Sequence, residues 1–230
     1  MIIVNQYFGL GDIIWEQTLA RAIADGKPII WPVMPQFVEG LNRAYPDITF
    51  VDMNLLKLDY NRNYEYEFAG AKILPLRFAD SLCQVQYKDC MKSKYMLYGM
   101  DWRNWKDKAM WKRDKTKERM LFNQLGLKRG ESYNLINRFF GSNSQLVAPI
   151  KVDNGLPNVE LCSIEGYSLF DWAMVIQNAA NIHVVSSSIC YILELLDLRA
   201  KEICIYKRIP IENSHYNYDY ILTSHEYILM

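Results

Sequence analysis

The stretch MIIVNQYFGLGDIIWEQTLARAIADG (residues 1–26) determines the fold that we expect. It opens with an apolar, β-branched run, which predicts a buried strand over residues 1–8. After a Gly-Leu-Gly turn, the spacing of Ile13, Leu19 and Ile23 predicts a helix from Asp12 to Asp25, and Gly26 ends it. A strand, a tight turn and a helix in this order are typical of a parallel sheet with helices on its faces.

The same alternation continues along the first half of the chain. Residues 36–45 have a helical pattern, and further strands are expected over PIIWPVM (28–34), ITFVDM (48–53) and AKILPLRF (71–78). Residues 83–128 are rich in Lys, Met, Tyr and Trp and predict helices that end near Gly126. Their charges indicate a solvated helical face, with a surface for an acceptor or a partner as the alternative.

The second half repeats this plan. Strands are expected over 132–141, 158–166, 181–188 and 202–209, and helices over 168–180 and 188–198. The expected fold class is therefore α/β, with two small Rossmann-like domains that face each other across a cleft. The first domain would cover residues 1–125, including the helical segment, and the second residues 126–230.

Composition excludes several classes of protein. The 230 residues include 26 basic and 26 acidic side chains, so a general attraction to nucleic acid is not expected. The five cysteines are widely spaced, and His183, His215 and His225 do not lie at ligand spacing from cysteines or carboxylates, so neither disulfides nor a metal site is expected. The absence of a leader and of a long apolar run favours a cytoplasmic protein without a membrane span.

The turn FGLGD (8–12) resembles a phosphate-binding glycine loop but lacks its further requirements. The third glycine of a dinucleotide fingerprint would fall at Ile14, and no acidic residue follows the second expected strand. Asp12 would also repel a pyrophosphate at the start of the helix. Two interpretations of Asp12 remain, as the cap of the helix or as a general base that accepts a proton from an attacking hydroxyl.

The second half contains residues suited to an anion. Ser186, Ser187 and Ser188 lie between an expected strand and an expected helix, where hydroxyl and amide groups can bind a diphosphate. Arg138 ends another strand and can form paired hydrogen bonds with phosphate oxygens. The alternatives are an ordinary serine cap and a surface salt bridge. A base in one half and an anion site in the other are together typical of an enzyme that transfers a sugar from a nucleotide diphosphate.

At these residues the chain resembles glycosyltransferases of the GT-B architecture. FGLGDIIWEQTLARAI (8–23) resembles the GxGDxLxxxPxxxxL start of the bacterial heptosyltransferases, in which the aspartate matching Asp12 is the proposed base. Residues 168–196 resemble the donor segment of that family, which ends in xxVxxDTGxxHLA. In this chain Ser186 stands for the aspartate, Ser188 for the glycine and Tyr191 for the histidine, so the donor sugar is left open.

The same segments resemble, less closely, the GDP-fucose-dependent fucosyltransferases, whose starts read GGLGNQxFQYA and whose HxRR motif is reduced here to Arg138. The resemblance implies an enzyme that needs no metal and no cofactor other than its nucleotide-sugar donor. Glu165 and Tyr167 lie just after NVELCSI (158–164), at the carboxyl end of this expected strand, where we expect them to contact the ribose or the sugar of the donor. Asn5 and Gln6 precede the glycine turn and are expected to hold the acceptor, with ordinary hydrogen bonding at the strand end as the alternative. Gly9 and Gly11 would make room for the acceptor, and we expect Asp171 to start a helix.

Two other functions remain as alternatives. A transferase-derived module could bind a glycan or a protein without catalysis, through an aromatic surface that lies between residues 95 and 111 and consists of Tyr95, Tyr98, Trp102, Trp105 and Trp111. A nicotinamide-dependent oxidoreductase is the second alternative, and the incomplete fingerprint argues against it.

Overall fold

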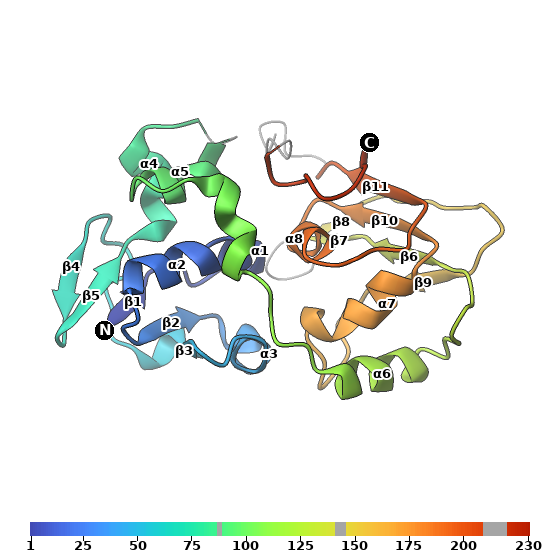
Figure 1. Cartoon of the computed structure of the whole chain (residues 1–230), viewed down its shortest axis with the longest axis horizontal. Helices are drawn as coiled ribbons and strands as arrows, with labels where there is room; N and C mark the ends of the chain where they lie inside the picture. Colours follow the sequence, from blue (N-terminus) through green and yellow to red (C-terminus); the bar gives the residue numbers. More distant parts are fainter. Residues whose placement is uncertain (87–88, 141–145, 209–219) are drawn as a thin grey trace. The chain divides into compact units, whose positions relative to one another are not determined.

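A computed structural model describes residues 1–86, 89–140, 146–208 and 220–230 of the chain (Figure 1). These residues form two compact α/β units, of which the first is Met1–Lys112 and the second extends from Arg113 towards the C-terminus. Gly141, which we expect to turn the chain after a strand, and His215 lie outside the described residues.

The first unit is built on a five-stranded sheet with the order β3-β2-β1-β5-β4. Its strands are β1 (Ile2–Val4), β2 (Ile29–Val33), β3 (Thr49–Asp52), β4 (Tyr66–Phe68) and β5 (Ala71–Leu74). All neighbours pair in parallel except β4, which runs antiparallel to β5. The four parallel strands are the ones that the sequence pattern predicts, whereas β4 lies in a polar stretch without a strand signal.

The helices of the first unit lie between and after these strands. They are α1 (Leu10–Trp15), α2 (Gln17–Ala24), α3 (Pro35–Ala44), α4 (Ala79–Cys83), α5 (Cys90–Met96) and the 3-10 turns η1 (Met53–Leu55), η2 (Leu76–Phe78) and η4 (Trp102–Lys108). The prediction of a single helix over residues 12–25 is wrong in one respect, because the helix is interrupted at Glu16. Glu16 is buried, and its carboxyl group pairs with Lys94 from a distant part of the chain.

The aromatic-rich segment packs onto α1 and α2. Trp15 Nε1 donates a hydrogen bond to the carbonyl of Met91, and the Tyr95 hydroxyl donates one to the carbonyl of Trp15, each at 2.8 Å. Tyr95, Trp105 and Trp111 are buried, so these rings build the core of the first unit. An aromatic binding surface would have only Tyr98 and Trp102, which are half-buried.

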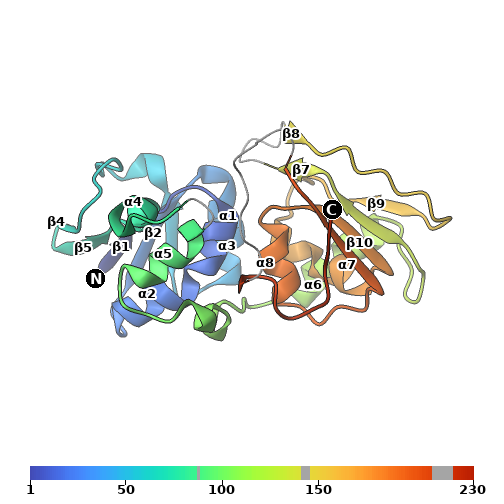
Figure 2. The same ribbon diagram turned by 90° about the horizontal axis from the view of Figure 1, so that it is seen from above.

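The second unit contains a five-stranded sheet with the order β12-β11-β10-β6-β9. Figure 2 labels β9 and β10 of this sheet. Its strands are all parallel and comprise β6 (Asn134–Asn137), β9 (Asn158–Glu160), β10 (Asn181–Val185), β11 (Glu202–Tyr206) and β12 (Ile228–Leu229). The sequence pattern predicts all of them except the short, exposed β12. A separate antiparallel pair joins β7 (Phe139–Phe140) to β8 (Leu146–Val147).

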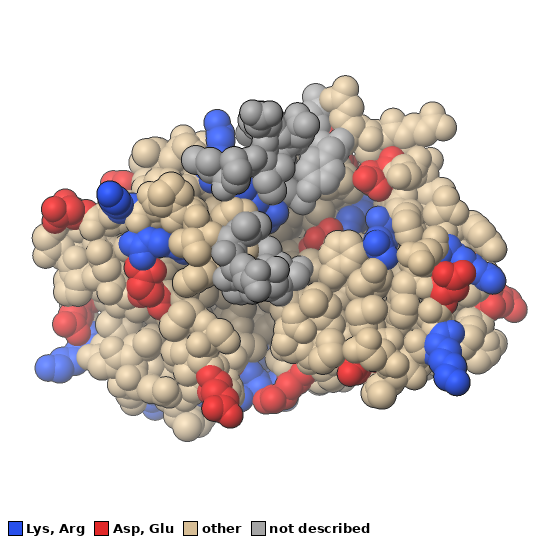
Figure 3. All heavy atoms as spheres, turned by 180° about the vertical axis from the view of Figure 1, so that it is seen from behind, with Lys and Arg blue, Asp and Glu red and all other residues tan. Residues whose placement is uncertain are grey.

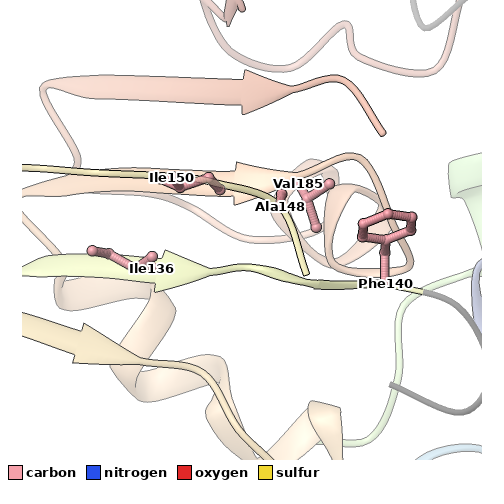
Figure 4. Close-up of a cluster of buried hydrophobic side chains, with 5 residues drawn as sticks. All are labelled: Ile136, Phe140, Ala148, Ile150 and Val185. Atoms are coloured by element: carbon pink, nitrogen blue, oxygen red, sulfur yellow. The ribbon is translucent and has the colours of Figure 1, made fainter. Parts of the chain in front are cut away.

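The helices of this unit are α6 (Lys115–Gln124), η5 (Leu169–Trp172), α7 (Ala173–Asn178) and α8 (Ile189–Glu194). One face of the sheet carries a buried apolar cluster, shown in Figure 4 and made of Ile136, Phe140, Ala148, Ile150 and Val185. The fold class is therefore α/β, with two mostly parallel five-stranded sheets, as the sequence predicts.

The boundary between the units lies N-terminal to the position that we expected from the sequence. Helix α6 packs against α7 and η5, and Arg113 donates a hydrogen bond of 2.7 Å to Glu118 Oε1. The division therefore falls at Lys112 and Arg113, before α6, and not after residue 125.

Among the described residues, no helix combines the length and the apolar character needed to cross a membrane. On the face in Figure 3, basic and acidic side chains are interspersed over the described residues. This distribution agrees with the balanced charge of the sequence.

Candidate functional site

The carboxyl end of β1 leads into the turn that positions Asp12. Gly9 has a φ of +78° and is the N-cap of α1, and it forms no side-chain cap. The left-handed backbone favours glycine at this position, and a Cβ atom here would lie 2.3 Å from Oδ2 of Asp12 and displace that carboxylate. Asp12 is the third residue of the helix and does not cap it. Gly11 is buried in the first turn of α1.

Lys94, from α5, holds the Asp12 carboxylate. Its Nζ donates hydrogen bonds to Asp12 Oδ1 at 2.6 Å and to Gln6 Oε1 at 3.2 Å, and it also pairs with Glu16 Oε1. Lys94 is only 5% exposed, and the Asp12 side chain is 31% exposed. Within the described part of the chain, no other side chain pairs with Asp12. This ion pair fixes one carboxylate oxygen, and Oδ2 faces Gly9.

Burial couples the ionisation of Glu16 and Lys94 to each other and to the charge of Asp12. Burial raises the pKa of Glu16 to about 8, against the opposing effect of Lys94. Burial by itself would lower the pKa of Lys94, but Asp12 and Glu16 outweigh it and the pKa of the ammonium is raised. Lys94 is therefore a fixed cation, and Glu16 is a carboxyl group that holds its proton into the neutral range. The sequence shows no local signal for this lysine, since it is one of several in a basic segment.

Two other predicted residues of this region are buried at the end of β1. Gln6 donates a hydrogen bond of 2.7 Å to the carbonyl of Phe8, and its own Oε1 accepts from Lys94. Asn5 donates to the carbonyl of Tyr60, while its Oδ1 is buried with no partner among the residues described. Gln6 thus orients Lys94, and Asn5 lies below the surface.

In the second unit, the serines lie at the carboxyl end of β10. Ser186 is buried, and its backbone N–H donates to the carbonyl of Tyr206 at 2.9 Å. Asn137, at the end of β6, donates a hydrogen bond of 3.2 Å to the Ser187 hydroxyl. Ser188 takes the N-cap position of α8 but forms no side-chain cap.

Arg208 is an additional basic residue at the same edge of this sheet, and the sequence analysis missed it. It follows β11, and its Nε donates a hydrogen bond of 2.5 Å to the carbonyl of Ser186. Its guanidinium carbon lies 5.8 Å from the centre of the Phe140 ring. The signal that could have identified it is a basic residue directly after a predicted strand, because carboxyl ends of parallel strands share one edge of a sheet.

Arg138 is held by its own unit. It donates a hydrogen bond of 2.8 Å to the carbonyl of Ile150, and it forms an ion pair with Glu160. Its side chain is 27% exposed. The salt bridge that the sequence analysis weighed as an alternative is therefore present.

The residues after β9 lie in a turn. Glu165 is exposed, and the Tyr167 ring lies 5.8 Å from Nζ of Lys117 in α6. Asp171 accepts hydrogen bonds from the backbone N–H and hydroxyl of Ser168 at 2.7 and 2.9 Å, in a capping box that starts η5. The expectation that Asp171 starts a helix is confirmed.

One cluster of potential metal ligands cannot be recognised from sequence spacing. His183, Glu202 and Cys204 each place one potential ligand atom within 4.8 Å of the others. Sequence spacing missed the cluster because His183 lies in β10 and the other two in β11, and strand pairing brings them together. Burial lowers the pKa of His183, which favours the neutral ring.

Comparisons with known proteins give one structural similarity. No protein-family model and no curated protein sequence matches the chain. The fold is similar to the ADP-heptose LPS heptosyltransferase II of E. coli, with a TM-score of 0.48 and 9% sequence identity, over 100% of this chain and 89% of that one. At these values the similarity does not transfer an activity or the role of any residue.

Proposed function

We propose that the chain is a glycosyltransferase that uses a nucleotide diphosphate sugar, with Asp12 as the general base. The observation that carries this proposal is the placement of Asp12. Its carboxylate is part-exposed and does not cap the helix, whose N-cap residue is Gly9. The buried ammonium group of Lys94 orients it. Capping the helix would have explained an aspartate in this turn, and Asp12 does not cap it.

The proposed donor site lies in the second unit. Ser187, Ser188 and Arg208 follow the carboxyl ends of parallel strands, the edge at which open α/β sheets bind ligands. A guanidinium and hydroxyl groups can offset the charge of a departing nucleoside diphosphate. We infer that transfer needs no metal at this site. Arg138 would contact the donor only after its ion pair with Glu160 is broken.

A non-catalytic binding module is the weaker candidate. Three residues of its proposed aromatic surface, Tyr95, Trp105 and Trp111, are buried in the core of the first unit. An oxidoreductase is disfavoured because β2 is followed by Met34 and Pro35, so no carboxylate is available there for a cofactor ribose.

The first test is release of nucleoside diphosphate from a panel of UDP, GDP and ADP sugars, with and without candidate acceptors. In Asp12→Asn we expect the rate to fall by about 100- to 10,000-fold, because the proton acceptor is lost while the shape is kept. Asp25→Asn is the matched control, since Asp25 is an exposed aspartate at the end of the neighbouring helix α2. Wild-type rates in Asp12→Asn would remove Asp12 from the mechanism.

The second test separates binding from catalysis. A nucleoside diphosphate at about 100 times its dissociation constant should stabilise the native chain by about 2.7 kcal/mol. We expect Arg208→Gln to lose most of the resulting thermal shift. Arg199→Gln should keep it, because Arg199 is exposed and contacts only Asn178 and the backbone of Gln177 among the described residues. Equal shifts in both variants would contradict the proposed donor site.

A further inference from the structure

Two neighbouring strands of the second unit bring together three different metal-binding side chains. In the parallel pairing of β10 with β11, His183 lies opposite Cys204. Glu202 is two residues before Cys204 on the same strand, so its side chain points to the same face of the sheet. A ring nitrogen of His183, the sulfur of Cys204 and a carboxylate oxygen of Glu202 all lie within 4.8 Å of one another.

His183 has the surroundings of a metal-binding histidine. The residue is 6% exposed, and its Nε2 is buried without a hydrogen-bond partner in the described part of the chain. Its other nitrogen, Nδ1, lies 3.4 Å from the hydroxyl of Tyr206. A buried polar atom without a hydrogen-bond partner destabilises the folded chain, and a bound ion at Nε2 would remove that cost. A contact to one nitrogen that leaves the other open is the arrangement that outer-shell partners give to metal-ligating histidines.

We propose that His183, Cys204 and Glu202 bind one zinc-type divalent cation, with water at the fourth position. A set of one imidazole, one thiolate and one carboxylate suits Zn²⁺, whereas Mg²⁺ and Ca²⁺ prefer oxygen ligands. Without the metal, Cys204 Sγ donates a hydrogen bond of 3.0 Å to Glu202 Oε1. On binding, a metal–sulfur bond forms, the thiol proton passes to the buffer, and both groups contact the same ion.

The position of this cluster indicates a structural role and not a role in the proposed transfer. Glu202 is the first residue of β11 and is exposed, so the ion would be reached from the side of the amino ends of the strands. Arg208 lies four residues beyond Cys204, which corresponds to about 13 Å along an extended chain. The ion would join β10 to β11 and stabilise the second unit by mass action.

Cobalt substitution tests the site directly. The intact chain is treated with chelator, desalted and titrated with Co²⁺. We expect a near-ultraviolet cobalt–thiolate charge-transfer band that saturates at one equivalent and is displaced by Zn²⁺. Cys204→Ser should abolish the band, whereas Cys162→Ser, the matched control at an exposed cysteine, should keep it. The absence of a band in the wild type, or its persistence in Cys204→Ser, would overturn the proposal.

Two milder variants keep the test decisive if Cys204→Ser does not fold. Glu202→Gln changes an exposed side chain, and Tyr206→Phe removes only the hydroxyl near His183. We expect Tyr206→Phe to weaken Co²⁺ binding by about 10- to 100-fold, the usual effect of changing an outer-shell partner. Glu202→Gln replaces a proposed ligand, so it should weaken binding at least as much. Unchanged affinity in Glu202→Gln would exclude the carboxylate as a ligand and with it the proposed site.

Discussion

Nζ of Lys94 lies 2.6 Å from Oδ1 of Asp12, although the two residues are 82 positions apart in the chain. The same ammonium also pairs with the buried Glu16 and donates a hydrogen bond of 3.2 Å to Gln6 Oε1. A helix from the aromatic-rich segment thus supplies the cation that holds the turn after the first strand. The candidate base is therefore one member of a buried charge cluster.

Replacing this cation should destabilise the first unit. In Lys94→Met an unbranched side chain of similar size is kept, but Asp12 loses its compensating charge and Glu16 loses its hydrogen-bond donor. We expect a loss of about 3–5 kcal/mol, the usual cost of removing one partner of a buried ion pair, measured by urea unfolding followed by circular dichroism. Lys92→Met, in the same helix, is the control, because Lys92 is more exposed and pairs with Asp89 near the surface. A loss in Lys94→Met no larger than in Lys92→Met would show that the cluster contributes little to stability.

The pH dependence of stability should carry the signature of Glu16. Its pKa is raised by burial from 4.5 to about 8 in the folded chain. Between these values the unfolded state releases a proton that the folded state keeps, so the contribution of Glu16 is greatest below 4.5 and is lost as the pH rises through about 8. The slope can reach about 1.4 kcal/mol per pH unit. Glu16→Gln should remove this slope, and unfolding free energies measured across the range compare the two proteins. Parallel pH profiles would be inconsistent with a protonated Glu16.

The glycine turn can be tested with a pair of matched substitutions. Gly9 and Gly26 have nearly the same φ, +78° and +77°, but only a Cβ at Gly9 would meet the Asp12 carboxylate. Gly26→Ala therefore measures backbone strain alone, about 1–2 kcal/mol. Gly9→Ala should cost more in thermal unfolding and should also lower nucleotide-sugar turnover, because it displaces Asp12. Equal effects of the two changes would argue that Asp12 is not held against this glycine.

The ion pair of Arg138 with Glu160 makes opposite predictions for two substitutions. If Arg138 serves the donor, Arg138→Gln should weaken nucleoside diphosphate binding, whereas Glu160→Gln should release the guanidinium and strengthen it. Thermal shifts with UDP, GDP and ADP measure both, and Glu226→Gln, at an exposed glutamate, is the control. Weaker binding in Glu160→Gln would assign the pair a purely structural role.

The sequence by itself determined the α/β class and most strands, because a buried strand has an apolar pattern that is visible within a few residues. It also located the Gly9 turn and the capping role of Asp171, since both depend on neighbours in the chain. The sequence pattern did not predict β4 and β12, because both are short, partly exposed edge strands. Their pairing depends on a neighbouring strand that is already in place.

Only the tertiary structure decided which charges meet. The pairing of Lys94 with Asp12, of Arg138 with Glu160, and of His183 with Cys204 follows from helix packing, side-chain burial and strand register. No local pattern records these partners, because the energy of a charge depends on what surrounds it in space. Hydrophobic periodicity acts between near neighbours in sequence, whereas electrostatic pairing acts between near neighbours in the folded chain.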